Sequence, residues 1–516
     1  MTRDLVRIRL EPLSVELDLP RGGSLVPGLA AHGVEFPCGG MGECSGCQVR
    51  VLSGSLPVTE ADSATLTPDQ LAKGWRLACQ ARPHESLVLE CGQWHMEILA
   101  DATTPGKASP CPVLSESATT DWERVGDQAA SSSRGLAVAI DLGTTTIAAQ
   151  LIDASGNVLA VETALNPQAS FGSDVMSRIR AALEGQDLTT PIRVALGQIV
   201  ARLARGRASQ VAEVLLVGNT VMHHLFCGLD VEPLAHVPFQ SPHLAEQRFI
   251  PRDLGWDLPP DGVVRFARCI GGFVGSDILA GIVAAGIALG DNLTALVDLG
   301  TNGEIAIGNR HGIVCASTAA GPAFEAGSIR MGMRAVTGAI AYVALVDGTL
   351  RATVLGDIAP RGICGSGLVD AVAAGLRSGS ILSNGRIADG SKIFPIAPPV
   401  VLYQSDIREL QLAKGAIAAG FRLLLKRLGA QVSSLHAIHL AGAFGNYVQI
   451  ESALRIGLLE APHSVIHAAG NTALRGAKML LLADEPQLPP IEHVSLAADP
   501  AFQDEFASCM TFPEPV

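Results

Sequence analysis

The sequence predicts a multidomain protein that combines α+β and α/β architecture, and three observations support this. A run of three cysteines lies within a first region of short alternating strands. A polar stretch with little periodicity follows it. The remainder alternates buried strands with helical segments and contains Asp-Leu-Gly-Thr twice, each time after an apolar strand. We therefore expect one domain over 1–99, a linker over 100–134, and a two-lobed body over 135–290 and 291–516.

Composition limits the classes of function. The chain has 516 residues, enough for three or more domains, and only 4% are aromatic, so its cores must be built from small aliphatic residues. The net charge of −13 argues against nucleic acid and anionic membranes as partners. The apolar run 278–290 is too short to span a bilayer and predicts a buried helix. Eleven cysteines and an N-terminus without a signal-like apolar run indicate a reducing, cytoplasmic location.

Four cysteines form the strongest motif of the first region. Cys38, Cys44, Cys47 and Cys79 have the spacing C-x5-C-x2-C-x31-C, with four glycines between the first and third. Glycines allow a loop to fold tightly around inorganic sulfide. The run resembles that of plant-type [2Fe–2S] ferredoxins, C-x4-C-x2-C, with one more residue in the first gap, as in the adrenodoxin-like branch. A structural zinc site or a disulfide is the alternative, but zinc sites favour paired C-x2-C units, and here the second unit is a single cysteine.

The rest of the first region predicts a small sheet with short helices. The expected elements are strands over 6–10 and 15–19, a helix over 24–31 ending at Gly33, a strand over 48–52, a short helix capped by Thr67, and a last strand over 87–89. This order resembles the β-grasp fold of ferredoxins. The following stretch, 101–134, is rich in Ser, Thr, Pro and Ala, and predicts a tether with a short helix near Trp122.

Glycine turns follow three strands of the body. Strand 136–140 leads into Asp141-Leu142-Gly143-Thr144-Thr145-Thr146, and antiparallel hairpins over 147–152 and 158–163 follow. Strand 294–297 leads into Asp298-Leu299-Gly300-Thr301-Asn302-Gly303, and strand 437–440 into Ala441-Gly442-Ala443-Phe444-Gly445. Such turns present N–H groups and hydroxyls to phosphate, and an Asp at each can hold Mg²⁺ through water. One such turn is ordinary hairpin chemistry, whereas the repeated pair with a third turn predicts a phosphate clamp.

The order of these turns resembles the ASKHA superfamily of acetate and sugar kinases, heat-shock chaperones and actin. The resemblance implies a first phosphate loop, a second phosphate loop and an adenosine-side turn. Their residues are Gly143, Thr144, Thr145 and Thr146; Gly300, Thr301, Asn302 and Gly303; and Gly442, Ala443 and Gly445. A Walker P-loop and a dinucleotide-binding GxGxxG are both missing from the sequence.

A ferredoxin region, a tether and an ASKHA body together resemble the reductive activators of corrinoid proteins. The segments that carry this likeness are the cysteine run, 76–80, 141–146, 166–168, 218–220, 317–325, 362–367 and 441–445. The resemblance implies a [2Fe–2S] cluster, ATP with Mg²⁺, and one-electron reduction of inactive Co(II) to Co(I) on a partner. That partner is a corrinoid protein of a methyltransferase system or a cobalamin-dependent methionine synthase. A homodimer is left open as the assembly state.

Several polar residues have two interpretations. Asp141 and Asp298 are expected to act on Mg²⁺ and phosphate, with an ordinary turn Asp as the alternative. Asp277, at an expected helix start, is suited equally to orienting the attacking water and to capping the helix. We expect Glu304 and Glu325 in solvated or capping positions rather than on nucleotide.

Other polar motifs are expected to be structural. His223 and His224 lack ligand-like partners and are expected in the core or on the surface. Gly365-Ser366-Gly367 looks like a nucleophile elbow but lacks a matching His and Asp, and so predicts a helix start. The seven cysteines outside the motif are expected to be small core residues: Cys91, Cys111, Cys227, Cys269, Cys315, Cys364 and Cys509.

Three other functions remain open at this point. One is a chaperone or regulator whose ATP cycle controls binding. Another is a small-molecule kinase with a redox sensor. The third is an activator of radical dehydratases, which typically uses a subunit-bridging [4Fe–4S] site. The sequence has no Asp-x-His-x-x-Gly run, so cobalamin belongs to the partner, and it has no flavin or nicotinamide module, so an external low-potential electron donor is needed.

Overall fold

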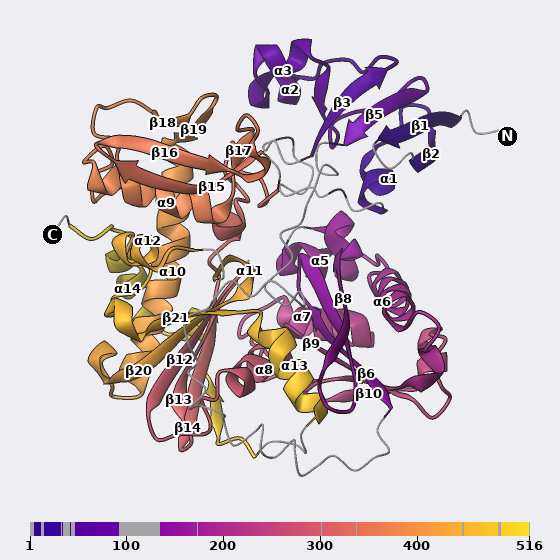
Figure 1. Cartoon of the computed structure of the whole chain (residues 1–516), viewed down its shortest axis with the longest axis vertical. Helices are drawn as coiled ribbons and strands as arrows, with labels where there is room; N and C mark the ends of the chain where they lie inside the picture. The colour runs from indigo at the N-terminus through magenta and orange to yellow at the C-terminus, as the bar shows by residue number, and fades with distance from the viewer. Residues whose placement is uncertain are drawn as a thin grey trace.

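A computed structural model gives the fold of the chain (Figure 1). It describes residues 5–11, 15–31, 34, 42, 47–91, 135–172, 174–300, 302–336, 338–445, 448–482 and 487–514. The expected linker over 100–134, including the helix expected near Trp122, lies outside these residues. So do Cys38, Cys44, Cys111, Gly33 and Thr301.

The N-terminal region is built on a five-stranded sheet of order β2-β1-β5-β3-β4. Its strands are β1 (Leu5–Glu11), β2 (Val15–Pro20), β3 (Gln48–Ser53), β4 (Trp75–Leu77) and β5 (Leu87–Cys91). The expected β1–β2 hairpin is confirmed, and β1 alternates buried and exposed residues. The last strand, β5, lies in the centre, parallel to β1 and antiparallel to β3.

Three short helices accompany this sheet among the described residues of the region. They are α1 (Val26–Ala31), α2 (Glu60–Thr65) and α3 (Pro68–Ala72). The cap expected for α3 is confirmed, since Thr67 Oγ1 accepts from Gln70 N at 3.3 Å and Gln70 Oε1 accepts from Thr67 N at 2.9 Å. Sequence analysis missed β4 and α2, although Thr59 and Asp62 form the same kind of box around α2.

The body contains two six-stranded sheets that repeat one pattern. The first sheet has the order β10-β11-β9-β6-β7-β8. Its strands are β6 (Leu136–Leu142), β7 (Thr146–Ile152), β8 (Val158–Leu165), β9 (Val211–Gly218), β10 (Gln247–Phe249) and β11 (Val263–Phe266). The β6–β7 and β7–β8 pairs are antiparallel, as expected, and β9 runs parallel to β6. Helices α5 (Val175–Leu183), α6 (Thr189–Ala204) and α7 (Thr220–Cys227) pack against this sheet.

The second sheet has the order β21-β20-β12-β13-β14-β22. Its strands are β12 (Leu293–Leu299), β13 (Gly303–Asn309), β14 (Gly312–Thr318), β20 (Leu435–Ala441), β21 (Ile466–Gly470) and β22 (Ile491–His493). Here β12, β13 and β14 are antiparallel neighbours, and β20 runs parallel to β12. The repeated Asp-Leu-Gly-Thr therefore marks the same hairpin in two equivalent sheets. The long helix α10 (Gln404–Arg427) packs on this sheet, with α14 (Phe502–Cys509) beside it.

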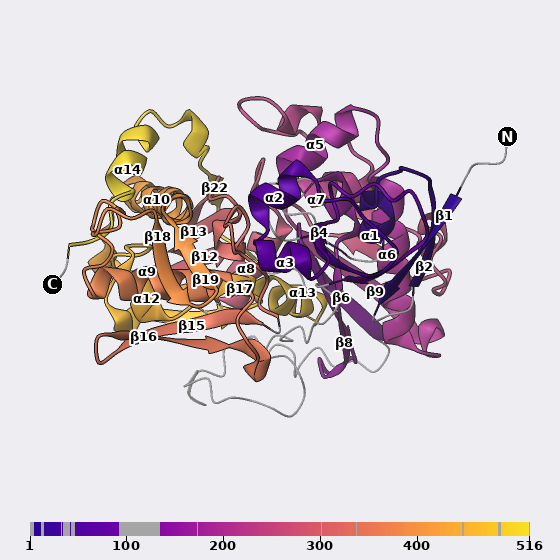
Figure 2. The same cartoon turned by 90° about the horizontal axis from the view of Figure 1, so that it is seen from above.

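A smaller subdomain, drawn in orange in Figure 1, adds a three-stranded sheet of order β16-β15-β17, a β-hairpin and a helix. Its elements are β15 (Ala339–Val346), β16 (Thr349–Val354), β17 (Gly362–Ile363), α9 (Gly365–Arg377), β18 (Ile393–Ala397) and β19 (Val400–Tyr403). Sequence analysis did not predict this sheet. Figure 2, seen from above, shows the N-terminal sheet and this subdomain on opposite sides of the molecule.

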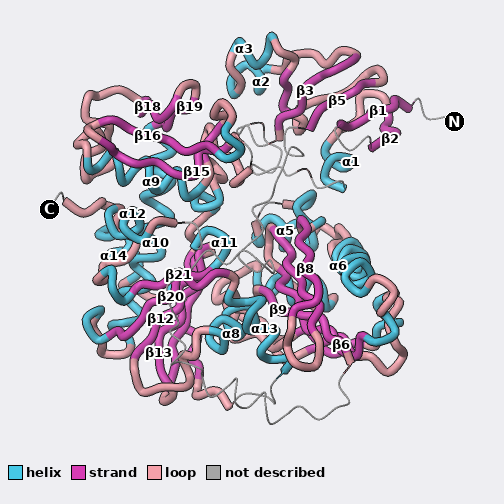
Figure 3. The backbone as a smooth tube through the Cα atoms, in the orientation of Figure 1, coloured by secondary structure: helices cyan, strands magenta, loops and turns pink. Residues whose placement is uncertain are grey.

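Two helices, α8 (Ser276–Ala284) and α13 (Thr472–Leu482), pack against each other between the large sheets (Figure 3). Ala477 of α13 packs on the first sheet against Leu215, while Ile278 of α8 packs on the second sheet against Leu296. Each sheet is therefore covered in part by a helix from the other half of the sequence. The expected buried helix within 278–290 is confirmed as α8. None of the described helices combines the length and hydropathy needed to cross a membrane.

Candidate functional site

The first glycine turn joins β6 to β7. Gly143 N donates to Thr146 O at 3.1 Å, and a Cβ at Gly143 would lie 2.6 Å from that oxygen, so the turn requires glycine. Asn166 Nδ2 donates to Gly143 O at 2.9 Å, and Asn219 Nδ2 donates to Thr144 Oγ1 at 2.9 Å. The side-chain amides of two asparagines thus hold the turn in place. Thr146, at the end of the turn, is exposed.

The second and third turns meet at Asp298. Gly300 N donates to Asn302 O at 3.1 Å between β12 and β13, in the position equivalent to the first turn. Gly442 follows β20 with φ +85°, and a Cβ there would lie 2.4 Å from Asp298 Oδ1. Glycine at 442 therefore allows the start of α11 (Gly442–Gly445) to approach the carboxylate of the second turn.

Four carboxylates gather at these turns, and their pKa values are raised by burial in all four and additionally by mutual repulsion in three. Burial raises the pKa of Asp141 to about 6 and, together with the charge of Asp141, raises the pKa of Asp298 to about 7. Burial and the charges of Asp141 and Asp298 raise the pKa of Asp277 to about 8. Burial and the charges of Asp277 and Asp298 also raise the pKa of Glu304. Such a group favours a cation that offsets its charge.

The expectation for Glu304 is wrong. It is 8% exposed, and it belongs to this carboxylate group rather than to a solvated or capping position. It lies at the start of β13, directly after Gly303, so the hairpin that forms the second turn also turns Glu304 inward. Glu325, at the end of η6 (Pro322–Glu325), is half-buried.

The position of Asp277 shows that it is not the N-cap of its helix, so the capping interpretation is wrong. The N-cap of α8 is Gly275, and Asp277 lies in the first turn, where its Oδ1 accepts from Ile278 N at 2.8 Å. A Cβ at Gly275 would lie 2.1 Å from Gly218 O, so glycine lets α8 begin against the end of β9. This close approach places Asp277 beside the first turn.

The described carboxylates do not form a direct metal cage. No three His, Cys, Asp or Glu side chains in the described part of the chain are arranged to ligate one ion. Mg²⁺ keeps several waters and is commonly held through one or two carboxylates together with phosphates. The arrangement therefore fits a hydrated Mg²⁺ better than a dehydrated metal.

Asn471 is a site residue that sequence analysis missed. Its Nδ2 donates to Asp141 Oδ2 at 2.8 Å, and its Oδ1 accepts from Leu474 N at 2.7 Å at the start of α13. The local signal was a Gly-Asn pair before a helix, which indicates a cap. Nothing in that pattern identifies a partner in the first turn.

The N-terminal site is described at Cys47, Cys79 and one glycine of the loop. Both cysteines are buried, and Ala78 N donates to Cys47 O at 3.0 Å, which holds their segments together. Gly42 has φ +80°, and a Cβ there would lie 2.9 Å from Ala61 Cβ. Thr65 Oγ1 donates to Gly42 O at 3.0 Å. The tight loop geometry expected of cluster ligation is thus present at Gly42.

Asp62 supports the same site and was also missed. It is 1% exposed, and its Oδ1 accepts from Leu77 N at 2.7 Å, two residues before Cys79. Its Oδ2 accepts from both Thr59 N and Thr59 Oγ1. The Thr-x-x-Asp spacing was the available signal, because it is typical of a capping box.

The histidine pair, the Gly-Ser-Gly segment and the described cysteines outside the motif lie in structural positions, as expected. His223 and His224 are fully buried in α7, and His224 Nε2 lies 2.7 Å from Ser241 Oγ. Ser366 lies in the first turn of α9, where its Oγ donates to Ala341 O at 2.9 Å. The described cysteines outside the motif are buried, except that Cys227 is half-buried: Cys91, Cys227, Cys269, Cys315, Cys364 and Cys509.

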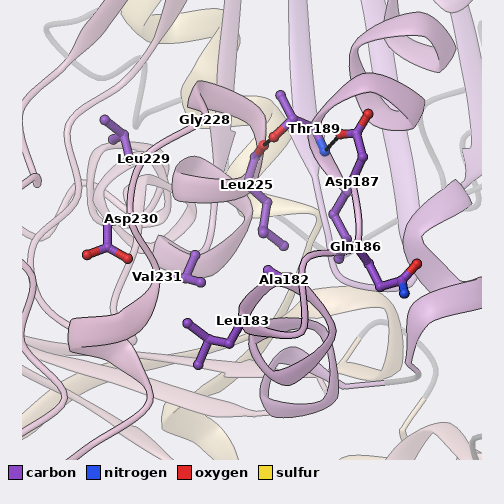
Figure 4. A pocket seen from close by; sticks show the side chains of 11 residues that line it. Ala182, Leu183, Gln186, Asp187, Thr189, Leu225, Gly228, Leu229, Asp230 and Val231 are labelled. Atoms are coloured by element: carbon purple, nitrogen blue, oxygen red, sulfur yellow. Dashed lines mark hydrogen bonds between the residues drawn. The ribbon is translucent and has the colours of Figure 1, made fainter.

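A separate pocket of about 250 Å³ lies beside α5, α6 and α7 (Figure 4). Leu183, Leu225 and Val231 line it, and Asp187 at its edge accepts hydrogen bonds from Thr189 N and Thr190 N. None of the three glycine turns or four carboxylates lines this pocket. Asp187 is occupied in starting α6, and Asp230, the second aspartate of the lining, accepts from Glu232 N at 2.9 Å. Since none of the lining residues belongs to the turns or the carboxylate group, the pocket is separate from the site described above.

Comparison with known proteins identifies the family. Family models match a 2Fe-2S iron–sulfur cluster binding domain over 8–84, the RACo middle region over 136–289, and the C-terminal ASKHA domain of RACo over 292–515. The corrinoid activation enzyme RamQ of Eubacterium limosum is 35% identical over 412 residues, covering 72% of this chain and 69% of RamQ. A [Co(II) methylated amine-specific corrinoid protein] reductase of Methanosarcina barkeri is 27% identical over 377 residues, covering 67% of this chain and 69% of the relative.

A solved structure agrees over nearly the whole chain. The structure of a reductive activator for corrinoid, iron–sulfur protein matches with a TM-score of 0.64 at 26% identity, covering 99% of this chain and 98% of its own. The expected ferredoxin and ASKHA folds are thereby confirmed. The chain belongs to the RACo family, the reductive activators of corrinoid proteins.

Proposed function

We propose that this protein uses Mg-ATP to drive one-electron reduction of a Co(II) corrinoid partner to Co(I). The observation that carries the nucleotide half of this proposal is the group of Asp141, Asp277, Asp298 and Glu304, gathered at two equivalent glycine turns. Repelling carboxylates beside N–H-rich turns suit a cation bound together with phosphates. Family membership supports the redox half.

The turns have distinct roles in this proposal. The first turn, 143–146, and the second, 300–303, hold the phosphates from two sides, and the third, at Gly442, Ala443 and Gly445, lies by the adenosine. Asp141 and Asp298 hold Mg²⁺ through water. Asp277 orients the attacking water, since a carboxyl whose pKa is about 8 is suited to accept a proton near neutral pH.

The four cysteines have one shared role. Cys38, Cys44, Cys47 and Cys79 hold the [2Fe–2S] cluster, which supplies one electron at a potential near −400 mV if it behaves as in plant-type ferredoxins. The Co(II)/Co(I) couple is expected to lie lower, and each 100 mV uphill costs roughly 2.3 kcal/mol for one electron. Closure of the body on ATP supplies this free energy by favouring a complex in which cobalt is easier to reduce.

The partner and the domain roles follow from the same proposal. RamQ is named as a corrinoid activation enzyme, and the Methanosarcina relative is named as a reductase of a methylated amine-specific corrinoid protein. We therefore propose a corrinoid protein of a methyltransferase system as the partner, with a cobalamin-dependent methionine synthase as the alternative. An external low-potential donor reduces the domain over 1–99, and the linker over 100–134 lets it reach the cobalt. The proposed location is the cytoplasm, whose reducing conditions suit free thiols.

Anaerobic mixing tests the proposal. Reduced protein is mixed with candidate Co(II) corrinoid proteins, with and without Mg-ATP, and Co(I) is followed by its absorbance. We expect Co(I) only with ATP, and partner-stimulated ATP hydrolysis. Asp141→Ala and Asp298→Ala should weaken both while leaving the cluster spectrum unchanged, because the two sites lie in separate parts of the chain.

Two outcomes contradict the proposal in different ways. Efficient Co(I) formation without nucleotide removes the coupling to ATP. No Co(I) with any corrinoid partner from the source genome favours an ATP-controlled regulator instead. A protein that lacks 1–99 should lose reduction and keep partner binding, which separates electron delivery from docking.

A further inference from the structure

Arg178 is a fully buried cation beside the first glycine turn. It lies on α5 with 0% exposure, and its Nε donates to Gly172 O at 3.0 Å. Its Nη1 lies 3.5 Å from the weak acceptor Met222 Sδ, and its Nη2 has no hydrogen-bond partner among the described residues. A guanidinium has five N–H donors, and leaving a buried one unsatisfied is costly. The burial of this arginine therefore costs stability.

Met222 links Arg178 to the first turn. Asn166 Nδ2 lies 3.4 Å from the same sulfur and 2.9 Å from Gly143 O. Met222 N in turn donates to the side chain of Asn219, whose amide donates to Thr144 Oγ1. A shift of the guanidinium can therefore reach the turn by two routes of three contacts each, one ending at Gly143 O and the other at Thr144 Oγ1.

Two carboxylates lie near Arg178, and they belong to different halves of the body. Asp174 and Glu325 both favour its charged form, although burial lowers the pKa of Arg178 to about 9. Asp174 is engaged in capping α5, because it accepts from Ser177 N at 2.9 Å and Ser177 Oγ at 2.6 Å. Glu325 comes from η6, which follows strand β14 of the second sheet. The charge of Arg178 thus interacts across the two halves.

We propose that Arg178 is a positioning residue whose guanidinium pairs with Glu325 when the two halves close on ATP, and thereby sets the first turn for partner-stimulated hydrolysis. This proposal rests on the proposed nucleotide site. An unsatisfied Nη2 supplies the donor for the new charge-assisted hydrogen bond. The chain through Met222 and Asn166 transmits the pairing to Gly143.

A double-mutant cycle tests the pairing in the full-length protein. Arg178→Met, Glu325→Gln and the double variant are compared for the ATP-dependent shift in Tm and for hydrolysis stimulated by the Co(II) corrinoid partner. We expect each single change to lower the stimulated kcat by about tenfold with little change in KM, as loss of one charge-assisted hydrogen bond predicts. The double variant should be no slower than the singles, because both remove the same interaction.

Two further variants separate charge from packing. Arg178→Lys restores the charge without the planar fork and should recover part of the rate. Arg180→Met changes an exposed arginine on the same helix and should behave as the wild type.

Several outcomes overturn the proposal. Additive losses exclude the pairing. A rise in KM for ATP with Arg178→Met, independent of Glu325, assigns Arg178 to direct phosphate contact instead. A fall in Tm that is equal with and without ATP, with normal stimulated hydrolysis, assigns it a purely structural role. If ATP does not shift the Tm of the wild-type protein, the proposed function itself is contradicted. If ATP does shift it and the losses of the two single variants add in the double variant, only the pairing is contradicted.

Discussion

Asn471 donates a hydrogen bond to Asp141 across 330 positions of the chain, with 2.8 Å between Nδ2 and Oδ2. The same side chain caps the start of α13 through Leu474 N. The last long helix of the body is thereby tied to the carboxylate of the first turn. This contact stabilises the ionised form of Asp141 and so lowers its pKa against the effect of burial.

Asn471→Ala should weaken Mg²⁺-dependent ATP binding, because the pKa of Asp141 rises further once the amide is lost. It should also destabilise α13 by about 1 kcal/mol through loss of the cap. Asn471→Ser separates the two effects, since serine caps a helix well but is too short to reach Asp141. Titration of ATP affinity against Mg²⁺ is the measurement. Normal Mg²⁺ dependence in Asn471→Ser would show that the contact does not serve the cation site.

The carboxylate group should contribute less to the stability of the nucleotide-free protein as pH rises from about 4 to 8. The folded-state pKa values of Asp141, Asp298 and Asp277, about 6, 7 and 8, lie above the ordinary value of 3.8. At these carboxylates the folded state therefore binds more protons than the unfolded state in this interval, so their contribution to the free energy of unfolding falls with pH. Buried His223 and His439, whose pKa values are lowered to about 4, act in the opposite direction only below their ordinary value of 6.5, so the net loss is expected above it. Mg²⁺ should raise Tm more at pH 8 than at pH 5, because only ionised carboxylates attract it.

Asp277→Asn should flatten this pH dependence. It should also raise the Tm of the nucleotide-free protein at pH 8 by about 1 °C for each 1 kcal/mol of relieved repulsion, as expected for a chain of 516 residues. Asp389→Asn is the control, because hydrogen bonds from Ser391 lower the pKa of this exposed carboxyl. Thermal unfolding at several pH values provides the measurement. A wild-type Tm that rises steadily between pH 5 and 8 contradicts the interpretation of the group.

The sequence predicted the parts of the site that are local in the chain. Each Asp-Leu-Gly-Thr turn is encoded by adjacent residues, and the hairpin at Gly143 has the expected geometry. Glu304 was assigned to the wrong kind of position and Asn471 was missed, because their roles arise from distant elements. A residue at the start of a strand, or before a helix, carries no local mark of which carboxylate it will face.

The fold shows the same division. Strands β6 and β12 could be predicted because a continuous apolar run precedes a clear turn. The β15–β16 hairpin was overlooked although Asp347-Gly348 is a typical hairpin turn. Strand β17 (Gly362–Ile363) has no such local signal, since it has only two residues and pairs with a strand over twenty positions away. Such pairing depends on tertiary packing rather than on local preference.

Purified anaerobically, the protein should contain two irons and two sulfides per chain, as a [2Fe–2S] site requires. Cys44→Ser and Cys79→Ser should lose most visible absorbance, because each removes a thiolate ligand. Cys91→Ser is a matched control in the same domain, since burial raises the pKa of the Cys91 thiol to about 12 and keeps it a neutral core group. Zinc in place of iron, in protein made with ample iron, would overturn the cluster assignment.

Gly476→Ala should disrupt the packing of α13 on α8. A Cβ at Gly476 would lie 1.9 Å from Ala280 O, so the two helices must move apart. Overpacking of this kind costs about 1–3 kcal/mol, although alanine favours a helix over glycine by about 1 kcal/mol. Because α8 carries Asp277 and α13 begins after Asn471, the same shift should weaken ATP affinity.

Gly290→Ala is the control, since the atom nearest to an added Cβ at this position is 3.9 Å away. Urea unfolding with and without ATP measures both effects. A Gly476→Ala protein that is as stable as the wild type would show that the helices do not need this close approach, and one that loses stability but keeps ATP affinity would show that the helix pair does not position the carboxylates.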